Sequence, residues 1–112
     1  MSAEGFVVYY GLRWDIRQDD EATMQALERR QDERIQSARR HGLETYWGRT
    51  EEEERYFLFV GKELGCFGWE GQNSAHVEDE ELLRILDETK RKLRAAGFLG
   101  MPALHCQFEP DY

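Results

Sequence analysis

Apolar side chains recur at every second position near the start of the chain. Between Phe6 and Ile16 the even-numbered residues are all apolar or aromatic, whereas the odd-numbered ones include Tyr9 and Arg13. Successive side chains of a β-strand point to opposite faces of a sheet, so this spacing predicts a strand with one wholly apolar face and one mixed face. The chain is therefore expected to fold around a sheet that buries the apolar face.

Two helices and three more strands follow from patterns of the same kind. A helix is predicted from about Glu21 to about His41, with acids at its start as a helix N-terminus favours, although its apolar stripe is thin. A second helix is predicted over 78–96, where apolar residues recur at helical spacing. Gly42 and Gly97 are placed to end these helices in the left-handed conformation. The remaining strands are expected at 43–49, 55–61 and 103–109.

Two connections between these elements carry expectations of their own. Residues 50–54 end in four consecutive glutamates, which indicates a solvated hairpin loop. Residues 62–65 interrupt the strand pattern before Cys66 and Phe67 resume it. Either a bulge in one long bent strand or a tight turn into a separate short strand would explain this break. We favour the bulge, because Gly61 and Gly65 relieve the backbone there.

The resulting order of elements is β-α-β-β-α-β. A shift of 55 residues places Trp14 on Trp69 and Gly42 on Gly97, which indicates two similar halves at about 5–50 and 55–110. Two βαβ halves are the sequence form of a ferredoxin-like split βαβ fold. We therefore predict a single α+β domain over residues 1–112, with a four-stranded antiparallel sheet and two helices on one of its faces.

Composition excludes several classes of partner. The net charge of −8 disfavours nucleic acid and anionic membrane surfaces, because no basic patch is visible that would outweigh the overall field. No segment approaches the ~20 apolar residues of a membrane span, and the N-terminus lacks a signal-peptide pattern, so a cytoplasmic protein is expected. The two cysteines, Cys66 and Cys106, are expected to be buried free thiols rather than a disulfide framework.

The sheet face opposite the helices is the predicted functional surface. Strand alternation assigns six residues of interest to it, as ligand or interface residues: Tyr9, Arg13, Phe57, Phe59, His105 and Gln107. Whether Tyr46 or Trp47 joins them depends on the register of the second strand. An open face with three aromatic rings is too apolar to be left in water, so we expect something to cover it.

Three covers for this face come from different functional classes. Homodimerisation, sheet against sheet, would bury the aromatic rings. A small-molecule pocket would use Arg13 and His105 as its polar groups. Stacking of RNA bases is disfavoured by the negative charge and by the absence of the matching aromatic motif. We therefore expect a regulatory, ligand-binding or protein-interaction domain that forms a homodimer, with a small molecule or another protein as further partner. A cofactor-independent enzyme, of monooxygenase or isomerase type, is the alternative.

Individual chemical groups add little to this expectation. His105 is the best candidate for a general base, because the ordinary histidine pKa lies near neutral pH. It cannot share a metal ion with Cys106, since neighbouring strand residues point to opposite faces, and Cys106 is expected in the core. The glutamates at 51–54 lack the ligand spacing of a calcium loop, and the glycines at 61–71 lack that of a phosphate loop. We therefore predict neither a cofactor nor a metal site.

Overall fold

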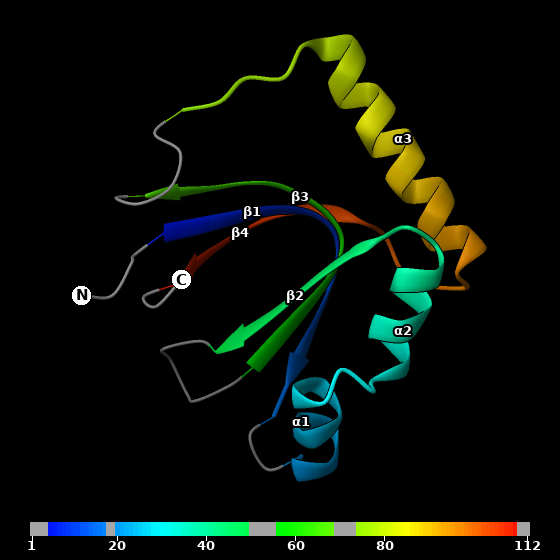
Figure 1. Ribbon diagram of the computed structural model, residues 1–112. Helices are drawn as coiled ribbons and strands as arrows, with labels where there is room; N and C mark the ends of the chain where they lie inside the picture. The colour runs from blue at the N-terminus through cyan, green and yellow to red at the C-terminus, as the bar shows by residue number, and fades with distance from the viewer. Residues whose placement is uncertain (1–4, 18–19, 50–55, 69–73, 110–112) are drawn as a thin grey trace.

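The protein folds as a four-stranded antiparallel sheet with helices on one side. A computed structural model describes residues 5–17, 20–49, 56–68 and 74–109. Its elements are β1 (Gly5–Ile16), α1 (Glu21–Glu28), α2 (Glu33–Arg40), β2 (Glu44–Arg49), β3 (Tyr56–Gly68), α3 (Asp79–Ala95) and β4 (Ala103–Glu109). The strand order is β2-β3-β1-β4, so the predicted α+β ferredoxin-like fold is confirmed (Figure 1). The predicted loop at 50–54 and the match of Trp14 with Trp69 involve residues outside the described ranges.

The first predicted helix is divided into α1 and α2, so the prediction of one continuous helix to His41 was wrong. After α1, the amide of Arg30 donates to the carbonyl of Leu27 at 3.0 Å and that of Gln31 to Ala26 at 2.8 Å. These two bonds form the Schellman motif that ends many helices. Asp32 then caps α2 by accepting from the amide of Arg34 at 2.9 Å.

The ends of α2 and α3 carry the same motif with the predicted glycines. Gly42 follows α2 with a φ of 72°, and Gly97 follows α3 with a φ of 81°. At the corresponding position after α1 the chain has Arg30, with a φ of 55°. A side chain in this left-handed conformation is strained, so an arginine at this position does not indicate a helix end in the sequence.

The interruption at 62–65 is a β-bulge in a continuous β3. Val8 pairs with Gly65 and the next residue, Tyr9, pairs with Glu63, so Leu64 is the extra residue. The carboxylate of Glu44 accepts from the Glu63 amide at 3.0 Å and from Lys62 Nζ at 2.7 Å, which holds the bulge against β2. The favoured of the two predictions for this segment is therefore confirmed.

The sheet is strongly bent, with the helices on its convex side (Figure 1). Arg13 Nη1 donates to Gln107 Oε1 at 2.7 Å across the other face. Gln107 is paired with Val7 of β1, and a straight strand would place Val7 about 20 Å from Arg13. The face without helices, called here the concave face, must therefore curve inward so that its two ends approach each other.

Two separate cores result from this bend. Beneath α1, α2 and the C-terminal part of α3 lies the main core, which includes Leu12, Leu27, Ile35, Leu58 and Leu93. A second, smaller core lies on the concave face and is formed by Val7, Tyr9, Phe57 and Phe59. No helix among the described residues is long and apolar enough to cross a membrane.

Candidate functional site

The six residues predicted on the open face do lie together on the concave face. The ring of Phe59 stacks on Tyr9 with a centroid distance of 5.2 Å and contacts the His105 ring at 5.3 Å. The Arg13 guanidinium lies over the rings of Phe57 and Phe59, 5.1 and 5.6 Å from their centroids. The pairing of Tyr46 with Phe59 also settles the open question of register, because it puts Tyr46 on the concave face and Trp47 on the helix side.

These aromatic rings are not exposed, so the expectation of an open aromatic face was wrong. Tyr9 is 1% exposed, and Phe57 and Phe59 are 0% exposed within a single copy of the chain. The bend of the sheet is the reason, because it brings Arg13 and Gln107 together over the rings. The concave face therefore needs no partner to cover its rings. That need was the basis for predicting the dimer surface on this face.

The polar groups of the concave face are largely engaged with one another. Besides Gln107, the Arg13 side chain donates to Asp15 at 2.9 Å. The Tyr9 hydroxyl is buried without a hydrogen-bond partner among the described residues. Burial, and then the nearby carboxylates of Glu44 and Glu63, raise the pKa of this phenol far above its usual range. Tyr9 therefore stays protonated at neutral pH.

A catalytic arrangement around His105 would need further groups within reach. Within the described part of the chain, His105 makes its ring contact with Phe59 but no hydrogen bond to Arg13 or Tyr9. No group of three or more His, Cys, Asp or Glu side chains is placed to hold a metal ion among the described residues. The role of His105 as a general base stays a prediction.

A different apolar surface is uncovered on the convex side, and sequence reasoning missed it. We call this surface the convex strip; it comprises the helix-side residues Phe6, Val8, Leu104, Cys106 and Phe108 of β1 and β4. Phe6 is 51% exposed, Leu104 is 60% exposed, and Cys106 is exposed as well. The rings of Phe6 and Phe108 lie 5.3 Å apart.

The convex strip is exposed because α3 does not lie along it. Figure 1 shows that α3 begins apart from the strands and approaches them only toward its end. Its buried residues, Thr89 and Leu93, belong to the C-terminal half of the helix, whereas Leu83 near its start is 60% exposed. The expectation of Cys106 in the core was therefore wrong, although its face was assigned correctly. Strand alternation gives the face but not the extent of the helix that covers it.

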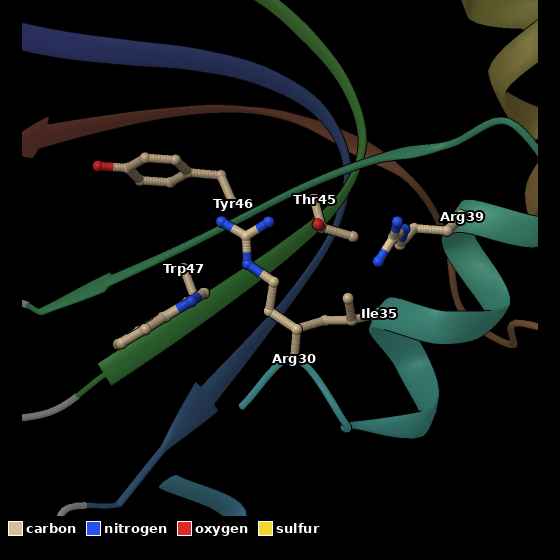
Figure 2. A pocket seen from close by; sticks show the side chains of 6 residues that line it. All are labelled: Arg30, Ile35, Arg39, Thr45, Tyr46 and Trp47. Atoms are coloured by element: carbon tan, nitrogen blue, oxygen red, sulfur yellow. The ribbon is translucent and has the colours of Figure 1, made fainter. Parts of the chain in front are cut away.

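A cavity of about 410 Å³ lies at the opposite edge of the sheet, beside β2. The described residues that line it are Arg30, Ile35, Arg39, Thr45, Tyr46 and Trp47. Figure 2 shows Arg30 reaching up from the break between α1 and α2, and Arg39 reaching from α2, both toward Thr45. The sequence did not indicate this site, because it depends on the helix break at Arg30. The acidic residues Asp32 and Glu33 were the available signal for a second helix start.

Comparison with protein-family models, with curated proteins and with solved structures gave no match for this chain.

Proposed function

We propose that the chain is a non-enzymatic binding domain that acts as a homodimer, with the convex strip as the surface between the two copies. The observation that carries this proposal is the exposure of Phe6 and Leu104 beside an exposed Cys106 on neighbouring strands. A contiguous apolar surface of this kind is a mark of protein association sites.

The edge strand β4 favours a second copy of the chain as the partner. Residues 103–108 contain no lysine, arginine or proline, which are the residues that commonly protect an exposed sheet edge from pairing. Two copies of β4 can pair antiparallel about a twofold axis perpendicular to the sheet. The two convex strips would then lie side by side on one face of a continuous sheet, and their β4 side chains would contact each other across the new strand pair.

A cavity next to the convex strip supports the same partner. It has a volume of about 330 Å³ and is lined by apolar residues that include Tyr10, Leu93, Phe98 and Met101, together with Lys90 and Arg94. Tyr10 pairs with Leu104, so the cavity adjoins the strip. In a symmetric dimer, an exposed apolar side chain of each copy can fit into the apolar cavity of the other copy.

The homodimer remains a proposal, but the surface proposed for it differs from the one expected from the sequence. Tyr9, Phe57 and Phe59 are already buried in one copy and would gain little from association. The apolar residues that would gain by burial lie on the opposite side of the sheet.

Light scattering over a range of concentrations tests the proposal. The wild type is expected at twice its 13.3 kDa chain mass, and Leu104→Lys is expected to be monomeric because it places a charge on the apolar strip. Leu83→Lys is the matched control, since Leu83 is equally exposed but lies on α3, and it should stay dimeric. A monomeric wild type, or a dimeric Leu104→Lys variant, would contradict the proposal.

A further inference from the structure

The cavity beside β2 presents two arginines to one space. Arg30 and Arg39 both line it, and none of the described residues that line it is acidic. Within the described ranges neither guanidinium makes a hydrogen bond or an ion pair. Both residues are exposed, so solvent screens their mutual repulsion, and an anion placed between them would be attracted by both. Such a pair of arginines is unusual in a chain where 23 acidic residues face 15 basic ones.

The backbone at Arg30 adds a second observation. Its φ of 55° is one that side chains other than glycine rarely adopt, and the equivalent positions after α2 and α3 hold Gly42 and Gly97. The chain therefore keeps an arginine where its own two other helix ends have glycine. A strained residue that lines a cavity is a reason to look for a function of its side chain.

The rest of the cavity is suited to a small molecule with an apolar body. Ile35 is buried, and the half-buried Trp47 and the hydroxyl group of Thr45 lie on the same helix side of β2, while Tyr46 borders the cavity from the other side of the strand. The volume of about 410 Å³ lies in the usual range for small-molecule sites, roughly 300 to 1,000 Å³. Guanidinium groups bind carboxylates and phosphates with two parallel hydrogen bonds each.

We propose that this cavity binds a small organic dianion, in which two carboxylate or phosphate groups contact Arg30 and Arg39 and an apolar body contacts Ile35 and Trp47. The site lies on the opposite edge of the sheet from β4, so binding is expected in the monomer as well as in a dimer. The inference is independent of the proposed homodimer.

Titration of ¹⁵N-labelled protein with phthalate, at constant ionic strength, tests the proposal. Amide shifts should be confined to the residues around the cavity, and benzoate, which has one carboxylate, should bind about tenfold more weakly because one charge-assisted contact is lost. Arg30→Gln and Arg39→Gln should each weaken phthalate binding about tenfold for the same reason. Inorganic phosphate, succinate and phthalate together show whether the charge or the apolar body dominates.

The chain offers matched controls for both arginines. Arg29→Gln and Arg40→Gln remove the same charge from exposed neighbours that do not line the cavity, and they should leave the affinity unchanged. Arg30→Gly should weaken phthalate binding at least as much as Arg30→Gln without lowering the urea midpoint, because glycine removes the guanidinium and relieves the strained φ.

Three results would overturn the proposal. One is an equal loss of affinity in the control variants, which would mean that only the overall charge matters. Another is the absence of saturable shifts with every dianion tested. The third is tighter binding of a glutamate-rich peptide than of phthalate, which would identify the β2 edge as a site for strand addition.

Discussion

At the scale of single residues, a pair of glycines allows the close approach of β1 and β3 in the bent sheet. Gly11 of β1 and Gly61 of β3 lie directly opposite each other. A Cβ atom on Gly11 would stand 2.1 Å from the carbonyl oxygen of Val60, and one on Gly61 would stand 2.1 Å from that of Tyr10. Such contacts with backbone atoms cannot be relieved by a change of side-chain rotamer, so the two strands must separate if either glycine is replaced.

Gly11→Ala is therefore expected to lower the free energy of unfolding by about 3 kcal/mol or more, from the combined clash and backbone strain. Gly97→Ala is the control, because Gly97 also has a positive φ but nothing lies within 4 Å of an added Cβ. Its cost should be about 1 kcal/mol, from strain alone. Urea unfolding measures both. Equal losses in the two variants would show that the close approach of the strands does not limit stability.

The concave face shows what a sequence can and cannot give at this scale. Strand alternation alone was enough to bring Tyr9, Arg13, Phe59 and His105 onto one face, since a face follows from odd and even positions. Their burial was not predictable in the same way. The burial of the rings follows from the bend of the sheet. The pairing of β1 with β3 in that sheet includes a bulge, and the sequence left this bulge as one of two alternatives.

At the scale of secondary-structure elements, the break between α1 and α2 depends on Asp32. This side chain is 9% exposed and accepts from the amide of Arg34 as well as from Nε and Nη2 of its guanidinium, at 2.9, 2.9 and 2.8 Å. The side-chain bonds from Arg34 lower the pKa of the Asp32 carboxyl against the opposing effect of burial. Strand and helix positions were predictable from periodicity, but a helix that restarts after a break of four residues keeps nearly the same periodicity.

Asp32→Ala should lower the free energy of unfolding by about 1 to 2 kcal/mol at neutral pH, the usual cost of a lost N-cap. Because the carboxyl pKa is depressed in the folded state, its contribution is present above the ordinary value of 3.8 and is lost as the pH falls through the folded-state value. The difference between wild type and variant in urea unfolding should therefore shrink below about pH 4. Asp20→Ala, which removes the exposed cap of α1, should have the smaller effect. A difference that stays constant with pH would contradict the ionic role of Asp32.

At the scale of the whole molecule, the two proposed surfaces lie at opposite edges of one sheet and differ in chemistry. The β4 edge is apolar, and the cavity at the β2 edge is cationic. Each arises where a helix does not cover the strand beside it: the first half of α3 leaves the convex strip uncovered, and the end of α1 places Arg30 beside β2. The regular part of the fold was predictable from the sequence, whereas the course of α3 and the break after α1 were not.

The net charge decides how the proposed dimer should respond to salt. Each copy carries −8, so association brings like charges together, while the contact in the convex strip is apolar. Salt screens the repulsion, and we expect the dimer dissociation constant to fall about tenfold between ~0.02 and ~0.5 M KCl, as measured by analytical ultracentrifugation. Leu83→Lys adds one positive charge to each copy and should show a shallower salt dependence. A dimer that weakens as salt is added would instead be held by ion pairs, and the convex strip would not be its main contact.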